Sequence, residues 1–326
     1  MADCVVVGDQ AHIVRAMQIA SAASGLAPLP ISVLPDLSAW SAHKPTMGLP
    51  LLQTPQIEAL SLPTAPLVAW GQTSAQAGQL AAQAVQTAAM EVLQGRARAL
   101  VTAPLNKASL HLAGYPYPGH TEMLQALSAA YLGISIEELP VRMMLANQQL
   151  SVVLDSIHVP LRAAVAQLNG AHLLQTLQIT HTSWLRHYGF APRIAVAGLN
   201  PHAGESGLLG DEEINIITPA LELASQRGLQ VSGPHPPDTV FMSARNTQPK
   251  LRSPFADVVV ALYHDQGLIP VKYLGVDDGI NITLGLPFVR TSPDHGTAFE
   301  LAGKGKARAE SLLGAINQAR ELSKRT

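Results

Sequence analysis

Short apolar runs rich in β-branched residues alternate along this chain with stretches of helical periodicity. The runs predicted to be strands are CVVVGDQ (4–10), ALVTAP (99–104), LSVVLDS (150–156), RIAVAGLNP (193–201) and VVVALYHD (258–265). Between the first two, apolar residues at helical spacing predict a helix over about 73–93, which Gly95 is placed to end. This alternation is typical of βα units around a parallel sheet, so we expect an α/β fold with mostly parallel sheets.

Length and composition limit the classes of protein to which the chain can belong. Its 326 residues favour two domains, because a single core rarely grows past about 250–300 residues. Only 13% of the residues are charged and the formal net charge is −2, so we expect neither nucleic acid nor an anionic membrane as a partner. Cys4 is the single cysteine, which excludes an internal disulfide and favours a reducing compartment. With no apolar run near about 18 residues, the expected location is the cytoplasm.

Three of the apolar runs lead into a histidine. These are His158, His202 and His264. If the runs are parallel strands, the imidazoles lie at the carboxyl edge of a sheet, where open α/β sheets bind ligands. Three neutral imidazoles suit zinc or another divalent metal with positions left for water and substrate. The alternative is that each is structural, as we expect of most of the twelve histidines.

Several loops carry residues suited to binding an anion. His120 and Thr121 follow a Pro/Gly turn at a predicted helix start, where free N–H groups favour an anion; the alternative for Thr121 is a simple N-cap. Lys107 stands at another helix start and is either a phosphate ligand or a solvated cap. A short span near His264 gathers further polar groups, and we interpret it as a substrate pocket: Lys272, Asn281, Arg290 and Asp294.

The glycines after the second of these histidines do not form a dinucleotide-binding fingerprint. Gly204, Gly207 and Gly210 lack the G-x-G-x-x-G spacing, so a Rossmann-type fold is not supported. We expect these glycines to shape the loop that presents His202.

Long motifs give the chain a specific resemblance. PGHTEML, LNPHAGESGLLGDEEI, ALYHDQGLIPVKYLG and GINITLGLPFVRTSPDHGTAFELAGKGKA resemble the 4-hydroxythreonine-4-phosphate dehydrogenase family over roughly residues 95–320. The resemblance implies a fold like that of isocitrate and isopropylmalate dehydrogenases, with the active site in a cleft between two α/β domains of a homodimer. The expected domains are 1–118 with 295–326, and 119–294. The family's opening strand and Gly/Pro-rich loop have no match, so the chain is expected to begin about one βα unit late.

The resemblance also implies roles for individual residues. His158, His202 and His264 become ligands of a divalent metal (Zn, Mg, Co or Mn), with His202 serving the partner's site. The implied substrate-binding residues are His120, Thr121, Lys272, Asn281 and Arg290. Lys272 or Asp238 is implied to relay a proton, and NAD or NADP is implied to lie against Asp294, His295, Gly296, Thr297 and Ala298.

The implied reaction is oxidation of 4-phosphohydroxy-L-threonine, followed by decarboxylation to 3-amino-2-oxopropyl phosphate in pyridoxal phosphate synthesis. Three alternatives remain. One is a metal-dependent dehydrogenase of another hydroxy-acid phosphate, such as threonate or erythronate 4-phosphate. The others are a phosphate acyltransferase-like enzyme, and a non-catalytic descendant that binds a metal or a phosphate ligand.

Overall fold

The computed structural model describes residues 3–42, 48–55, 67–247, 253–275 and 279–325. The chain divides into two compact units, Met1–Glu138 with His295–Ala309, and Leu139–Asp294 with Glu310–Thr326. The division differs from the expected domains in where it places 119–138 and the C-terminal segment. The segment belongs with the second unit because its helix packs on two strands there, and Thr291 Oγ1 donates a hydrogen bond of 2.8 Å to the carbonyl of Ala315.

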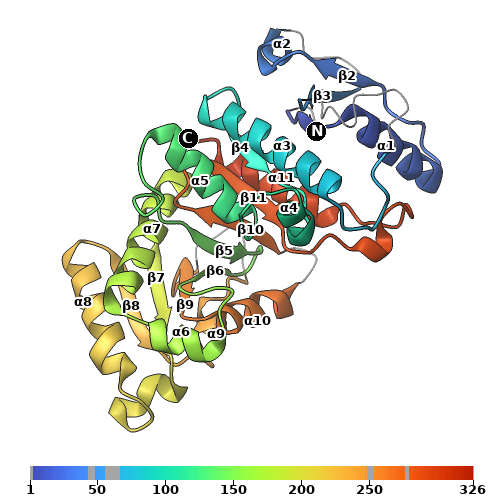
Figure 1. The fold of residues 1–326 in the computed structure, drawn as a ribbon. Coiled ribbons are helices and arrows are strands. Elements are labelled where there is room, and N and C mark those ends of the chain that lie inside the picture. The colour runs from blue at the N-terminus through green and yellow to red at the C-terminus, as the bar shows by residue number, and fades with distance from the viewer. Residues whose placement is uncertain (1–2, 43–47, 56–66, 248–252, 276–278, 326) are drawn as a thin grey trace. The chain divides into compact units, whose positions relative to one another are not determined.

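The first unit contains a small parallel sheet of order β1-β3-β2 (Figure 1). Its strands are β1 (Val6–Gly8), β2 (Ile31–Leu34) and β3 (Leu49–Gln53), and β4 (Ala99–Val101) also falls in this unit. The helices are α1 (Gln10–Ser24), α2 (Leu37–Ala42), α3 (Ala75–Leu93), α4 (Lys107–Leu112), α5 (His120–Leu132) and the 3₁₀ turn η4 (Phe299–Leu301). Residues 43–47 and 56–66 of this unit fall outside the described residues.

The predicted helix is confirmed to within two residues, and each predicted run contains a strand, although β7 and β9 end four residues before their runs do. Helix α3 begins after Ser74, whose hydroxyl accepts a hydrogen bond from the N–H of Ala77, and Gly95 beyond its end has φ +74°. The five predicted runs contain β1, β4, β6, β7 and β9. Each of these runs is rich in valine, isoleucine or leucine, which suits strands that are buried on both faces.

The second unit is built on a mixed sheet with strand order β11-β10-β5-β6-β9-β7-β8. The strands are β5 (Arg142–Ala146), β6 (Ser151–Leu154), β7 (Arg193–Ala197), β8 (Gln230–His235), β9 (Val258–Ala261), β10 (Ile280–Leu284) and β11 (Val289–Pro293). From β6 to β8 the neighbours are parallel, whereas β5, β10 and β11 are joined antiparallel. The fold is therefore α/β with mostly parallel pairing, as expected, and with an antiparallel extension that the sequence did not indicate.

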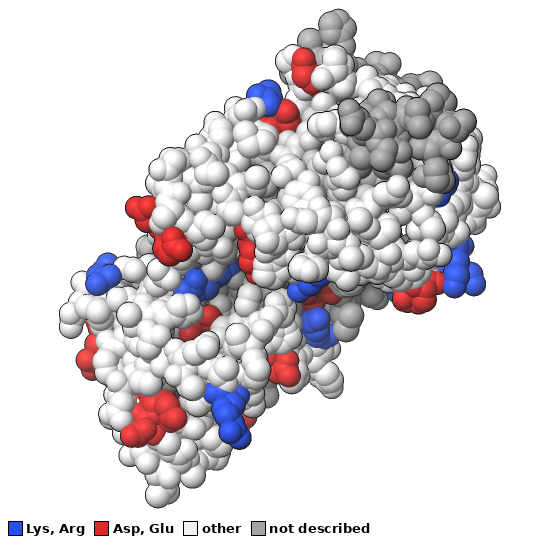
Figure 2. Space-filling model, in the orientation of Figure 1, with Lys and Arg blue, Asp and Glu red and all other residues white. Residues whose placement is uncertain are grey.

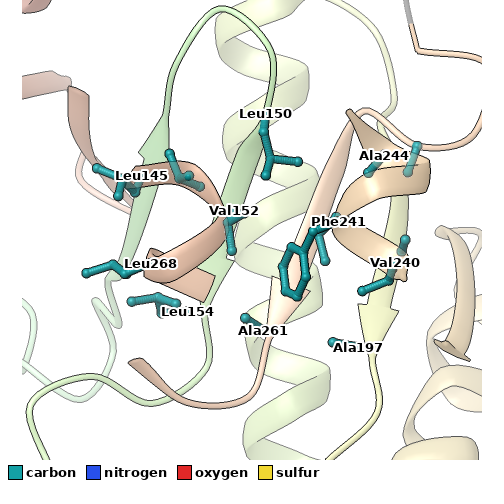
Figure 3. Close-up of a cluster of buried hydrophobic side chains, with 14 residues drawn as sticks. Leu145, Leu150, Val152, Leu154, Ala197, Val240, Phe241, Ala244, Ala261 and Leu268 are labelled. Carbon is teal, nitrogen blue, oxygen red and sulfur yellow. The ribbon is translucent and has the colours of Figure 1, made fainter. Parts of the chain in front are cut away.

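Helices cover both faces of this sheet (Figure 1). They are α6 (Leu161–Gln167), α7 (Gly170–Tyr188), α8 (Thr218–Gln226), α9 (Val240–Ala244), α10 (His264–Leu274) and α11 (Glu310–Leu322), with the short turns η2 (Pro201–Gly207) and η3 (Glu213–Ile217). Alternate residues of β6 and β9, such as Val152, Leu154 and Ala261, meet Phe241 and Leu268 from α9 and α10 (Figure 3). This buried cluster fixes both helices against the sheet.

Gly267 allows α10 to lie close to the sheet. A Cβ at this position would stand 2.8 Å from Val152 Cγ1 and 2.9 Å from the Cβ of Ala261, and both neighbours are fully buried. We predict that Gly267→Ala lowers the free energy of unfolding by about 1–3 kcal/mol, because overpacking displaces the helix. Gly314→Ala in α11 is the control, since its Cβ would meet only ordinary contacts at 3.7 Å. Equal denaturant midpoints for the two variants would contradict this account of the packing.

Candidate functional site

The carboxyl ends of β6 and β9 bring two of the predicted histidines together. The strands pair in parallel with Leu154 beside Ala261, and the N–H of Asp155 donates to the Ala261 carbonyl at 2.8 Å. Because the segments after β6 and β9 leave the sheet side by side, His158 in the loop after β6 and His264 at the start of α10 become neighbours. Their ring centroids are 5.6 Å apart, at an interplanar angle of 44°.

This pair of imidazoles fits a divalent metal of the zinc type. Two imidazoles that bind one ion through metal–nitrogen bonds of about 2.0–2.1 Å have ring centroids about 5.2–5.5 Å apart, if the nitrogen–metal–nitrogen angle lies between the tetrahedral and the trigonal value. His264 Nδ1 lies 2.6 Å from Asp265 Oδ1. In the neutral tautomer that donates this hydrogen bond to the carboxylate, Nδ1 carries the proton and Nε2 has the lone pair that a metal needs. Asp265 is thus a candidate orienting residue that the sequence reasoning missed, although its place beside His264 could have suggested it.

His202 occupies a different position. It lies in η2 after β7, on an exposed turn. Among the residues described, no group of three or more His, Cys, Asp or Glu side chains is arranged to hold a metal ion. The strand pattern alone predicted that all three imidazoles meet at one edge of the sheet. Within the described part of one chain they do not. The ligand set stays a prediction that requires a second copy of the chain.

The turn that carries His202 has an unusual backbone. Gly204, Gly207 and Gly210 have φ values of +80°, +94° and +141°, so these glycines do shape the loop, as expected. The carboxylates of Glu212 and Glu213 both accept hydrogen bonds from the side-chain amide of Asn200, at 2.7 and 2.9 Å. The bond from Asn200 lowers the pKa of Glu212 below its ordinary value.

A second buried amide ties two strand ends together. Gln266 Nε2 donates to the carbonyl of Gly198 at 2.7 Å, and its Oε1 accepts from the N–H of Leu262 at 2.7 Å. Gln266 therefore fixes the end of β7 to the end of β9, at the edge where the two histidine-bearing loops begin. Nothing in the sequence distinguished this glutamine from an exposed helical residue.

A pocket of about 430 Å³ opens beside His264. Its lining residues come from α9, α10 and the segments before them, and include Asp238, Phe241, Tyr263, Asp265 and Ile269. Asp238, a candidate proton relay, thus shares a pocket with the residue that contacts His264. The pocket is therefore lined by carboxylates together with apolar and aromatic side chains.

Lys272 and Asp294 form an ion pair. Lys272 lies in the last turn of α10, and its Nζ is 2.9 Å from Asp294 Oδ2, at the end of β11. The lysine side chain is 43% exposed and the carboxylate 16%. A half-exposed ammonium with one carboxylate partner can still reach a ligand or exchange a proton.

Asn281 and Arg290 lie on the antiparallel strands β10 and β11. Arg290 is buried and its Nη1 donates to Thr283 Oγ1 at 3.1 Å. Asn281 Oδ1 is buried and has no hydrogen-bond partner within the described part of the chain. A buried acceptor without a donor is costly, so Asn281 is a fitting place for a ligand hydroxyl or ammonium group.

The predicted anion site in the first unit has its expected local form. His120 and Thr121 are the first residues of α5, and Gly119 at its N-cap provides no side-chain hydrogen bond. The side chain of Lys107 lies beside this helix start, because a Cβ at Gly119 would be 3.6 Å from Lys107 Cε. N–H groups with a neighbouring ammonium favour a phosphate or a carboxylate.

The segment predicted to bind the nicotinamide cofactor follows β11. His295 Nδ1 lies 2.9 Å from the carbonyl of Gly296, and Ala298 has φ +44° at the start of η4. Gly71 supports this region from within the same unit, because a Cβ there would lie 2.7 Å from the Phe299 carbonyl. The assignment of this segment to the cofactor stays a prediction.

On the surface shown in Figure 2, basic and acidic side chains are dispersed and intermixed. Among the described residues, no helix combines the length and apolarity needed to cross a membrane.

The fold and the histidine pair define an α/β protein with two neighbouring imidazoles at the carboxyl edge of the parallel strands in its second unit. Residues 1–319 match the family described as pyridoxal phosphate biosynthetic protein PdxA, and the chain belongs to this family.

Relatives and solved structures agree with this assignment. The chain is 50% identical over 263 residues to the 4-hydroxythreonine-4-phosphate dehydrogenase of Beijerinckia indica, covering 80% of this chain and 73% of the relative. It is 48% identical to the D-threonate 4-phosphate dehydrogenase of Salmonella typhimurium, covering 78% and 73%. The crystal structure of 4-hydroxythreonine-4-phosphate dehydrogenase from Klebsiella pneumoniae superposes with a TM-score of 0.81 at 38% identity, covering 98% of this chain and 88% of that one.

The contact between His264 and Asp265 generates a prediction about metal affinity. Asp265→Asn should weaken Co²⁺ or Zn²⁺ binding roughly 10- to 100-fold, because a neutral amide orients the imidazole less firmly and makes it less basic. Glu222→Gln removes the same charge from an exposed position on α8 and is the control. Titration by calorimetry measures both dissociation constants. An Asp265→Asn affinity equal to that of the control would show that this carboxylate does not support a metal ligand.

Proposed function

We propose that this chain is a metal-dependent dehydrogenase that uses NAD or NADP to oxidise 4-phosphohydroxy-L-threonine to 2-amino-3-oxo-4-phosphooxybutanoate. Loss of carbon dioxide then gives 3-amino-2-oxopropyl phosphate, for pyridoxal phosphate synthesis. The observation that carries the proposal is the His158–His264 pair at the joined ends of β6 and β9, with Asp265 orienting the second ring. Family membership and relatives with this name support the choice of substrate.

His158 and His264 would hold the metal, with His202 supplied by a second copy of the chain in a homodimer. A bound Zn²⁺, Mg²⁺, Co²⁺ or Mn²⁺ would supply a Lewis acid, and NAD or NADP a hydride acceptor. The contact between His264 Nδ1 and Asp265 Oδ1 supports this role, because in the neutral tautomer that donates this bond Nε2 is available to a metal.

The other proposed residues bind and orient the substrate. Arg290 would hold a carboxylate or phosphate group through its guanidinium, in a buried setting where a charge-assisted hydrogen bond is strong. Asn281 would accept from a substrate hydroxyl or ammonium through its buried Oδ1. His120 and Thr121 would bind an anionic group at the α5 N-terminus.

Lys272 would move the proton that leaves the substrate hydroxyl. Its contact with Asp294 keeps the side chain positioned, and Lys272 would accept the proton as a neutral amine, with Asp294 able to take a proton from it in turn. Asp238 in the neighbouring pocket is the second candidate for the relay. Segment 294–298 would contact the cofactor. Its first residue, Asp294, is also the ion-pair partner of Lys272.

A second substrate has a specific observation in its favour. The Salmonella typhimurium relative named D-threonate 4-phosphate dehydrogenase is 48% identical, close to the 50% of the Beijerinckia indica relative. D-threonate 4-phosphate has a hydroxyl where 4-phosphohydroxy-L-threonine has an ammonium group. The same metal and phosphate contacts serve both compounds, so the difference must arise where that group binds.

The proposed function is tested by NADH formation, followed by absorbance. Chelator-treated protein should be inactive with 4-phosphohydroxy-L-threonine and should regain turnover when Zn²⁺, Mg²⁺, Mn²⁺ or Co²⁺ is added. D-threonate 4-phosphate, assayed in parallel, identifies the second candidate if its kcat/KM is higher. His264→Ala should lose metal-dependent turnover, while His111→Ala, on an exposed position of α4, should keep it. Failure with both substrates and every metal, from folded protein, would contradict the proposal.

The proton relay makes a separate prediction. Lys272→Ala should lower kcat by about 10²- to 10⁴-fold and leave substrate binding nearly unchanged, because it removes the proton-transfer group. Lys324→Ala is the control, since that lysine pairs with Glu321 at an exposed position. Steady-state kinetics and a direct binding titration give the two quantities. Near-normal turnover of Lys272→Ala would remove Lys272 from the relay.

A further inference from the structure

The turn that carries His202 is held in a conformation that most residues avoid. His202, Ala203, Glu205 and Ser206 have φ values of +52°, +53°, +43° and +59°, although none of them is glycine. Left-handed backbone at non-glycine residues is unfavourable and persists only where the surroundings enforce it. Some interaction outside the turn must therefore stabilise this geometry.

Glu213 provides that interaction. Glu213 is only 3% exposed. Its Oε1 accepts hydrogen bonds from the backbone N–H groups of Leu199 and Asn200, both at 2.7 Å. Oε2 accepts from Asn200 Nδ2 at 2.9 Å. The donors are thus two main-chain groups and one amide at the entry to the turn. A buried carboxylate needs such donors, and the need keeps the turn entry in place.

The turn also closes over the carboxylate. A Cβ at Gly204 would lie 2.8 Å from Glu213 Oε2, and one at Gly198 would lie 3.2 Å from Oε1. The backbone before His202 and the backbone after it therefore both contact the same side chain. Gln266, through its bond to the Gly198 carbonyl, links the start of this turn to the end of β9 that precedes His264.

We infer that Glu213 is a positioning residue that holds the turn around 198–206 so that His202 is presented as a metal ligand. The inference rests on the proposed role of His202 in metal binding. Glu213 itself contacts neither metal nor substrate in this scheme. Its carboxylate acts through Leu199, Asn200 and Gly204, which set the direction in which the turn leaves β7.

The test combines two measurements on full-length Glu213→Gln. The first is amide hydrogen exchange in peptides covering 198–206, without metal. The second is Co²⁺ affinity by spectroscopic titration of the dimeric protein. Glu205→Gln removes the same charge from an exposed residue of the same turn and is the control. If Glu213→Gln does not fold, Glu213→Asp keeps the charge but withdraws it from the N–H groups.

Glu213→Gln should raise exchange at 198–206 at least about 10-fold, because an amide places Nε2 against the donor Nδ2 of Asn200. It should also weaken Co²⁺ binding about 10- to 100-fold, as His202→Ala does, while Glu205→Gln changes neither. If His202→Ala weakens binding but Glu213→Gln leaves both quantities unchanged, the positioning role is overturned and the proposed metal site stands. If wild-type protein binds no Co²⁺, or binds it without need of His202, the ligand assignment falls and the inference falls with it.

Discussion

Parallel pairing of β6, β9 and β7 is the constraint on which the rest of the second unit depends. Because the strands share one direction, the loops after them start at one edge of the sheet. His158 and His264 therefore become neighbours although they are far apart in the sequence. The same edge is reinforced by polar groups that bond to backbone: Gln266 joins β7 to β9, and Ser156 Oγ donates to the Leu262 carbonyl at 2.9 Å. The chemistry proposed for the chain is therefore carried by loops whose origins are fixed by a buried sheet.

The buried sheet and its helices were largely predictable from the sequence. Runs such as Val258–Ala261 are apolar throughout and β-branched, which is typical of strands covered on both faces, and the structure confirms them. The antiparallel strands β5 and β10 were missed. RMMLA and INITL are short, and Asn281 in INITL was interpreted as a candidate ligand. The burial of both strands comes from pairing with each other across a long separation in sequence. Local pattern cannot reveal such pairing.

The candidate site was predictable in its residues more than in its arrangement. The strand-to-histidine pattern placed His158 and His264 together correctly. His202, by contrast, lies in a left-handed turn after β7, a conformation that the residue preferences of the segment PHAGES do not predict. That turn depends on Glu213, whose burial could be found only from the fold. Glycine spacing correctly indicated an unusual loop, because glycine most readily adopts positive φ.

The central claim is that the joined ends of β6 and β9 form a metal-binding site from histidine nitrogens. X-ray absorption of the zinc-loaded protein tests this most directly, since it reports the ligand atoms independently of substrate and turnover. The account predicts imidazole scattering with Zn–N distances of about 2.0–2.1 Å, reduced in His158→Ala and His264→Ala. A spectrum of oxygen ligands alone, unchanged by either substitution, would contradict it.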